Sequence, residues 1–187
     1  MRFGVMTIGA VMALTLLSGC ASTVISLPPY TPTGTQELSG GIQVTDFKYF
    51  PKKGVAQDVI HNTAAGELKL TESVGTYYTN AVRREFRQAG LSIKPGNTCT
   101  LDGEINDLTI DDLGFSATYR SDVRYILWDG NKKTLLDNDY VVKFDTTKFV
   151  NAEVIFANIN KVIADNIDKL MSDDAFHKAI VDHCGAK

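Results

Sequence analysis

The side chains best suited to acid–base or metal chemistry are scattered along this sequence. The three histidines are His61, in a polar stretch, and His177 and His183, which are six residues apart and therefore on different faces of a helix. None of them has a nearby acid and nucleophile in a catalytic pattern. We interpret all three as surface residues.

Acidic residues cluster at Glu104, Asp107, Asp111 and Asp112. Paired carboxylates can perform acid–base catalysis or bind calcium, but this spacing matches no calcium-binding loop. We interpret the cluster as solvated carboxylates at the end of a strand. An enzyme would become the better hypothesis only if Glu104, Asp107 and a histidine converged in one cleft.

The stretch Gly114–Thr118 (GFSAT) comes nearest to the nucleophile elbow of serine hydrolases, but it lacks the second glycine and begins a strand. Signatures of zinc peptidases, P-loop proteins and dinucleotide-binding proteins are absent. Neither Cys99 nor Cys184 has a His or Cys at metal-ligand spacing. We therefore predict no catalytic residue, no metal and no cofactor, and expect a protein that is not an enzyme.

A few residues could contact a partner instead. Arg120 and Arg124 lie two positions apart along the polar face of a strand and could form a ligand-facing basic pair with Arg83 or Arg84, although solubility and edge protection explain them as well. Trp128 stands beside a turn, and we expect it to be partly exposed, as Trp often is at contact surfaces. Tyr49 and Phe50, at the rim of a long loop, are the second candidates.

The N-terminus has the features of a secretion signal. Arg2 precedes an apolar run of about 13 residues at positions 5–17, which is too short for a membrane-spanning helix of roughly 20. The sequence Leu17-Ser18-Gly19-Cys20 then matches the lipobox of bacterial lipoproteins. We predict a signal peptide over residues 1–19 and lipidation of Cys20; an ordinary cleaved signal with a chance cysteine is the alternative.

Several acyl chains on Cys20, such as palmitate, would anchor the protein firmly, whereas one chain holds only marginally. Ala21 follows the cysteine in place of the Asp that retains many lipoproteins at the inner membrane. By resemblance to sorted lipoproteins of Gram-negative bacteria, we expect the periplasmic face of the outer membrane.

The mature chain would keep 18 basic and 22 acidic residues, a formal net charge of −4. Such a mildly acidic surface gives no reason to expect nucleic acid as a partner and argues against wide contact with anionic lipids. In an oxidising compartment, Cys99 and Cys184 are expected to form a disulfide; two separate buried thiols are the alternative.

Residues 20–39 are rich in Ser, Thr, Pro and Gly, and Pro28, Pro29 and Pro32 favour an extended conformation. We predict a lipidated, flexible linker here that lifts a single periplasmic domain, residues 40–187, off the membrane. Residues 50–65 are expected to form a long loop.

Apolar residues at helical spacing predict helices over residues 70–89 and 151–171, and Ser172 is expected to cap a short helix that ends near His183. Alternating patterns predict strands, with a bulge near Asp107 and a hairpin turn at Asp129–Asn131. The predicted strands are 41–49, 91–93, 100–110, 115–128 and 134–145. In the strand 115–128, the alternation places Phe115 on the apolar face, which is expected to pack.

These elements predict an α+β fold. We expect a two-layer sandwich in which a mostly antiparallel sheet of about five strands carries two main amphipathic helices on one face, together with a short C-terminal helix.

The layout, with the helix end Phe86–Leu91 (FRQAGL) and the strand start Leu101–Ile105 (LDGEI), resembles the YajG-like outer-membrane lipoproteins. These are similar in turn to the auxiliary lipoproteins of ABC-type lipid transport systems. The resemblance covers the layout of about residues 15–183 and offers no catalytic residue; the loop 50–65 and the Cys99/Cys184 pair do not match it. It implies a non-enzymatic lipoprotein that assists envelope transport or assembly.

Our leading hypothesis is a lipid-anchored binding or scaffold module that docks onto an envelope protein complex. The alternatives are a carrier that holds a lipid or cell-wall fragment between helix and sheet, and an enzyme with an unrecognised site.

Overall fold

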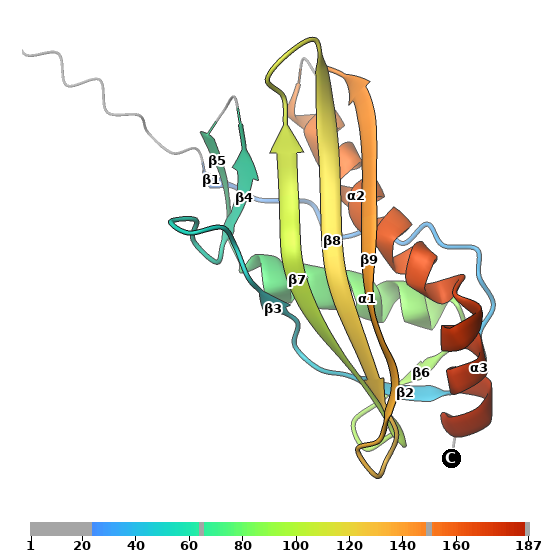
Figure 1. Ribbon diagram of the computed structural model, residues 1–187. Helices are drawn as coiled ribbons and strands as arrows, with labels where there is room; N and C mark the ends of the chain where they lie inside the picture. The colour runs from blue at the N-terminus through green and yellow to red at the C-terminus, as the bar shows by residue number, and fades with distance from the viewer. Residues whose placement is uncertain (1–23, 64–65, 149–150, 186–187) are drawn as a thin grey trace, which may run out of the picture.

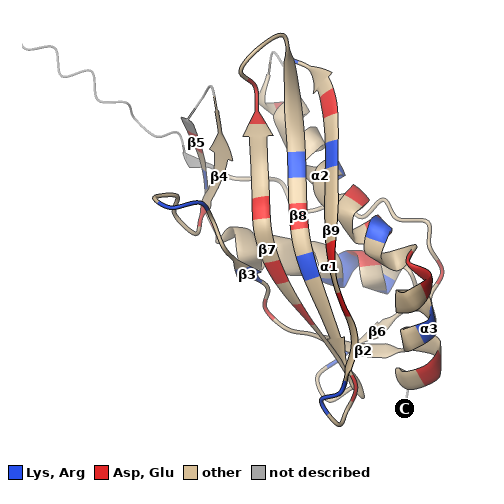
Figure 2. Cartoon of the chain, viewed as in Figure 1, with Lys and Arg blue, Asp and Glu red and all other residues tan. Residues whose placement is uncertain are grey.

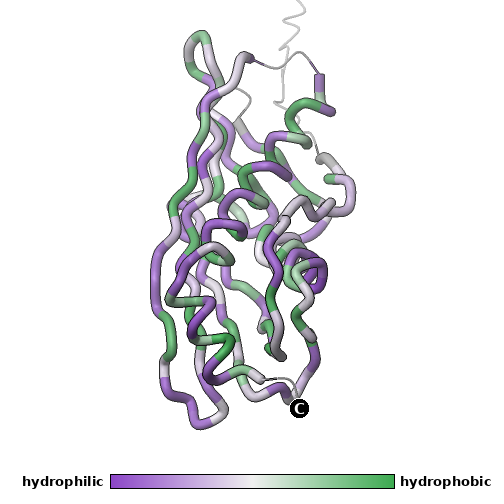
Figure 3. Tube along the Cα trace, turned by 90° about the vertical axis from the view of Figure 1, so that its right-hand side faces the viewer, coloured by the Kyte–Doolittle hydropathy of each residue, from purple (hydrophilic) through white to green (hydrophobic). Residues whose placement is uncertain are grey.

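The structure is a computed structural model that describes residues 24–63, 66–148 and 151–185 (Figure 1). Its helices lie on one side of the long strands, as the edge-on view in Figure 3 shows, and leave the other face of the sheet open. The α+β class is therefore confirmed. The helices are α1 (Val74–Gln88), α2 (Ala152–Met171) and α3 (Asp174–His183).

Three long strands form an antiparallel meander at one side of the sheet: β7 (Cys99–Asp111), β8 (Ser116–Trp128) and β9 (Thr134–Thr147). Along β8, odd-numbered side chains are buried against the helices and even-numbered ones face solvent. The pairing of β7 with β8 shifts between Ile105 and Asp107, which confirms the predicted bulge.

Short strands continue the sheet beyond β7, so that the described part of the chain has nine strands. β2 (Gly41–Val44), β3 (Lys48–Tyr49) and β4 (Val59–Asn62) pair one after another in parallel with β7. The outer strands are β1 (Val24–Ile25), β5 (Gly66–Leu70) and β6 (Ser92–Ile93).

The sheet is thus mixed, and its described residues form nine strands instead of the predicted five or so. Most of its paired residues are antiparallel, as predicted, and lie in the meander and in the pair β4–β5. The physical reason is strand length: segments of two to five residues are too short to display a period of two. For the same reason β4 was missed within the expected loop 50–65. Among the described residues, no helix is long and apolar enough to cross a membrane.

Phe47 fills the centre of the interface between helices and sheet. Its ring stacks on Tyr78 of α1, with centroids 6.0 Å apart, and meets Tyr125 of β8 edge-on at 5.7 Å. A Cβ at Gly103 of β7 would lie 2.1 Å from this ring, and one at Gly75 of α1 would lie 2.4 Å from the Phe47 carbonyl oxygen. The glycine of the LDGEI strand start is therefore required to seat Phe47.

A buried amide fixes α2 on the meander. The Tyr125 hydroxyl donates to Asn166 Oδ1 at 2.8 Å, and Asn166 Nδ2 donates to the Tyr140 carbonyl at 2.7 Å. Because a buried amide without partners is costly, these bonds favour one register of α2 over its neighbours.

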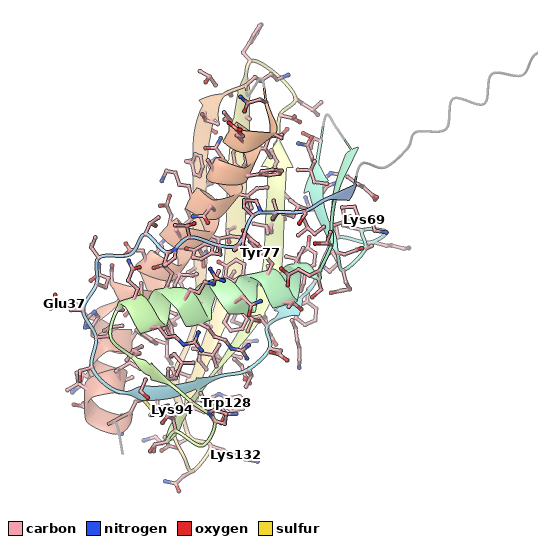
Figure 4. The ribbon with its side chains drawn as sticks, turned by 180° about the vertical axis from the view of Figure 1, so that it is seen from behind. Glu37, Lys69, Tyr77, Lys94, Trp128 and Lys132 are labelled. Atoms are coloured by element: carbon pink, nitrogen blue, oxygen red, sulfur yellow. A yellow bond between two sulfur atoms is a disulfide. The ribbon has the colours of Figure 1, made fainter. Side chains whose placement is uncertain are left out.

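Residues 26–39, which we call the N-terminal segment, lie against the helices in the view from behind (Figure 4). The carboxylate of Glu85 on α1, 1% exposed, accepts hydrogen bonds from the Tyr30 hydroxyl at 2.5 Å and from the Thr33 and Gly34 amides at 2.9 and 3.0 Å. The Leu38 amide donates to the Ala89 carbonyl.

The expected flexible linker is therefore wrong for the N-terminal segment. Its prolines do keep it extended, but a buried carboxylate needs donors, and the segment supplies them. Composition indicates the extended conformation but does not show that the segment binds Glu85. Cys20 and Ala21 lie outside the described residues.

The helix ends follow local rules. Gly90, with φ +98°, follows Ala89, the C-cap of α1, and a left-handed glycine is typical of this position. Asn151 caps α2. The cap of α3 is Asp173 and not Ser172, because Ser172 still ends α2.

Cys99 and Cys184 form the predicted disulfide, with Cα atoms 5.3 Å apart. It joins the first residue of β7 to the residue that follows α3, across 85 positions of the chain. The C-terminal helix is thereby fixed at the end of the sheet where β7 begins.

The close approach of the Phe47 ring to Gly103 leads to a prediction about stability. Gly103→Ala places a methyl group inside the ring of Phe47, so we expect urea denaturation to show a loss of about 1–3 kcal/mol in the free energy of unfolding. The control is Gly185→Ala, whose Cβ would meet no atom within 4 Å and which should shift stability by less than about 1 kcal/mol. Equal stability of the two variants would contradict the close approach.

Candidate functional site

The open face of the sheet, which we call the acidic face, is the candidate functional site. It is formed by the outward side chains of β7, β8 and β9 and bears eight carboxylates and three cations (Figure 2). The carboxylates are Asp102, Glu104, Asp107, Asp111, Asp122, Asp137, Asp139 and Asp145, and the cations are Arg120, Arg124 and Lys143. The net negative charge of the chain is therefore concentrated on this face.

Both predicted arginines lie at the centre of the acidic face and are already paired. Arg120 contacts Asp107 at 3.1 Å and Asp122 at 2.7 Å. Arg124 binds both carboxylate oxygens of Asp137, at 2.7 and 2.8 Å, and Glu104 at 3.2 Å. The arginines thus order the surrounding carboxylates, and the expected basic pair does not stand free.

The guanidinium of Arg124 also lowers the pKa of Asp137 below its usual range, through their hydrogen bonds and charge. Arg83 and Arg84, considered with the pair from sequence, lie on α1 and bind other groups. Arg83 donates to the Val44 carbonyl and contacts Asp46, and Arg84 donates to the Tyr30 carbonyl.

A groove of about 400 Å³ borders the acidic face beside β4, and both His61 and Asp107 line it. The carboxylate of Asp107 accepts hydrogen bonds from Arg120 Nε and from Thr109 Oγ1. Glu104 is not among the lining residues and is bound to Arg124. Of the three groups whose convergence would favour an enzyme, the groove therefore contains Asp107 and a histidine but not Glu104.

Metal-binding clusters give no alternative site. Among residues 24–63, 66–148 and 151–185, no three His, Cys, Asp or Glu side chains are grouped so that they could hold an ion.

The three predicted aromatic contacts have different surroundings. Trp128 is half-buried beside the hairpin turn, close to the expectation, and Phe50 is 51% exposed. Tyr49 is buried, because β3 pairs with β7 and turns the ring toward the core. It cannot serve as a surface contact in this structure.

Sequence reasoning missed an exposed apolar tip between β7 and β8. Phe115 was assigned to the buried face of its strand, but it precedes Ser116, the first paired residue of β8, and is fully exposed. Leu113 is 67% exposed beside it. The signal that could have identified the tip is Gly114, whose φ of +139° ends the alternation.

The expected ligand space between helices and sheet is occupied by Phe47, Tyr78 and Tyr125. An apolar hollow of about 410 Å³ lies elsewhere, on the outside of α2. Its walls include Pro28 and Pro29 of the N-terminal segment and Phe156 of α2.

Comparisons with known proteins show the fold. No protein-family model and no curated protein matches this chain. The crystal structure of XCC0632 from Xanthomonas campestris, of family model DUF330, is 10% identical with a TM-score of 0.63 over 85% of this chain and 95% of that one. An uncharacterized protein is 8% identical with a TM-score of 0.53 over 80% and 96%.

The lipoprotein GNA1162 from Neisseria meningitidis matches more weakly, at 11% identity and a TM-score of 0.32 over 67% of this chain and 96% of that one, and carries no argument. The chain therefore shares its fold with XCC0632 and with the second protein, at sequence identities too low to transfer a function.

Tyr49 shares with the other tyrosines a raised pKa, which can be tested by titration. All seven tyrosines have a pKa above the usual 10: burial, with a smaller effect of Asp107, raises the pKa of Tyr49 to about 12, and burial and the bond to Asp173 raise the pKa of Tyr140 to about 12. Because the pKa values are raised on folding, the stability they confer is complete below pH 10 and is lost as the pH rises toward 12.

We therefore expect the ultraviolet absorbance of tyrosinate to stay low in the folded protein at pH 10 and to rise together with loss of the circular dichroism signal at higher pH. In urea, the same absorbance should rise near pH 10. A rise near pH 10 with unchanged circular dichroism would show that a tyrosine is exposed.

Proposed function

We propose that the protein is a lipid-anchored binding module on the periplasmic face of the Gram-negative outer membrane, where it docks onto a protein complex. The lipobox Leu17–Cys20 supports the anchor, and Ala21 supports the outer membrane. The observation that carries the docking function is the concentration of fixed negative charge on one uncovered face of the sheet.

The finer assignment, a YajG-like lipoprotein that assists an envelope transport or assembly complex without being an enzyme, belongs to the same proposal. It is supported by the lipobox, by the FRQAGL helix end and by the LDGEI strand start, whose glycines have structural roles at the end of α1 and under Phe47.

Charge complementarity favours a partner with a basic surface. A surface of one sign steers an oppositely charged partner during association and repels partners of like charge. The arginine bonds hold the carboxylates in place, so that less side-chain entropy is lost on binding. Val141, 37% exposed among the charges on β9, offers an apolar contact within the face.

The face fits this role better than the sheet edge. Among the described strands, β9 pairs only with β8. Two of its backbone carbonyls already accept bonds from α2: Asn166 donates to the Tyr140 carbonyl and Lys169 to the Val141 carbonyl. Charged side chains on β9 further oppose the addition of another strand.

The test is a charge reversal with a matched control. Asp139→Lys with Asp145→Lys changes the charge of the acidic face, while Glu37→Lys with Glu72→Lys makes the same change at exposed sites elsewhere. In affinity capture from detergent-solubilised envelopes, we expect the face variant to lose the partner at least about tenfold and the control to retain it. Capture by the unmodified protein should also weaken with added salt.

Equal capture by both variants would contradict docking through this face. Capture of no protein by the unmodified chain would count against the binding function itself.

The hollow against α2 favours a second candidate function, the carriage of a lipid. Its apolar lining by Pro28, Pro29 and Phe156 suits an acyl chain. An acyl ligand found by native mass spectrometry in the extracted protein would favour this function.

A further inference from the structure

The anchor residue is close to the sheet along the chain. Cys20 precedes Val24, the first residue of β1, by four positions. Consecutive Cα atoms are about 3.8 Å apart, so Cys20 can be no farther than about 15 Å from β1. If Cys20 bears the lipid, as the proposed function requires, the bilayer surface must come about this close to the body of the protein.

The direction of β1 shows from which end the chain enters. β4 runs parallel to β7, β5 runs antiparallel to β4, and β1 runs parallel to β5. β1 therefore runs opposite to β7, and its first residue, Val24, lies at the end of β1 that faces the end where β7 finishes. Figure 1 shows β1 and the loop between β7 and β8 toward the same end of the molecule.

The lengths agree with this direction. Val24 pairs with Lys69, Lys69 pairs with Val59, and β4 continues from there to His61, which pairs with Thr109. Val24 is thus level with about residue 107 of β7, and the loop lies five residues, or roughly 17 Å, beyond it. The upper limit of about 15 Å between Cys20 and Val24 covers most of that distance.

Exposed apolar side chains gather at this end of the molecule, where β7 finishes. Leu113 is 67% and Phe115 is 104% exposed at the tip, and Val154 is 37% exposed at the start of α2. α2 begins near the tip because β9 ends there, with Thr147 paired to Ser116. Three of the six large apolar side chains that the described residues expose therefore gather at one end.

The tip rests on an ordered base. Asp111 Oδ1 accepts hydrogen bonds from the Leu113 amide at 3.2 Å and from the Thr63 hydroxyl at 2.8 Å, and Thr63 Oγ1 accepts from the Asp112 amide at 2.9 Å. The end of β4 thus supports the loop, and the two apolar side chains project beyond it.

We propose that Leu113, Phe115 and Val154 insert into the interfacial region of the bilayer that holds the lipidated Cys20. Apolar and aromatic side chains at the edge of an anchored domain favour this depth. The acidic face cannot take their place, because its negative charge is repelled by anionic lipids. The long strands therefore stand upright on the membrane, with the hairpin at Trp128 about 40 Å away from it.

The experiment uses the full lipidated chain, extracted from membranes and reconstituted in vesicles of phosphatidylethanolamine and phosphatidylglycerol with a share of bromine-labelled phosphatidylcholine. Bromine quenches tryptophan fluorescence only within the bilayer. Phe115→Trp reports on the tip, and the matched control Val181→Trp reports on an exposed site (72%) of α3 at the opposite end. Both keep Trp128, and both change a side chain that is largely free of packing.

Quenching and a blue shift for Phe115→Trp, without either for Val181→Trp, are the expected results. Vesicle flotation run in parallel reports on the anchor. If both variants float with the vesicles and neither or both are quenched, the upright insertion is overturned while the lipid anchor stands. If neither floats, the anchor and the insertion are both overturned.

Discussion

The buried carboxylate of Glu85 is the constraint on which the arrangement of this protein depends. Inside the interface it cannot remain without donors, and the N-terminal segment supplies three of them. The segment, which follows β1 at one edge of the sheet, is thereby held against α1. A sequence that reads as a tether thus becomes part of the folded body, and only the residues before Val24 remain between the body and Cys20.

The same constraint relates the two surfaces to which we assign a role, the apolar tip and the acidic face. In the proposed orientation the apolar tip faces the bilayer, and the meander of β7, β8 and β9 presents the acidic face sideways, along the membrane plane. A partner embedded in or bound to the same membrane would meet this face directly. The disulfide between Cys99 and Cys184 stabilises the far end, where β7 begins and the chain finishes.

Local patterns predicted the elements that bury one continuous face. The helices, the long strands, the bulge near Asp107 and the Cys99–Cys184 pair all followed from period and composition. The short parallel strands did not, since their pairing with β7 depends on contacts distant in sequence. The burial of Tyr49 depends on such a pairing as well, since Tyr49 pairs with Ile105 of β7.

The sequence identified individual residues of the candidate site but not the net negative charge of the acidic face. Arg120 and Arg124 were singled out as cations, but only the cross-strand register shows that Asp107 and Glu104 of β7 and Asp137 of β9 surround them. Asp122 is the neighbour of Arg120 on β8 itself. The face is therefore acidic, with its arginines serving to order it. Phe115 was expected in the core because the odd-numbered residues of β8 are buried. Gly114, with its positive φ, interrupts this alternation, and Phe115 is exposed.

The central claim is that this body is held at a bilayer through Cys20. Mass spectrometry of the N-terminal peptide, from protein purified out of bacterial membranes, tests it most directly. The account predicts a mature chain that begins at Cys20 and carries acyl groups on that residue. A mature chain that begins at another residue, or an unmodified Cys20, would contradict it.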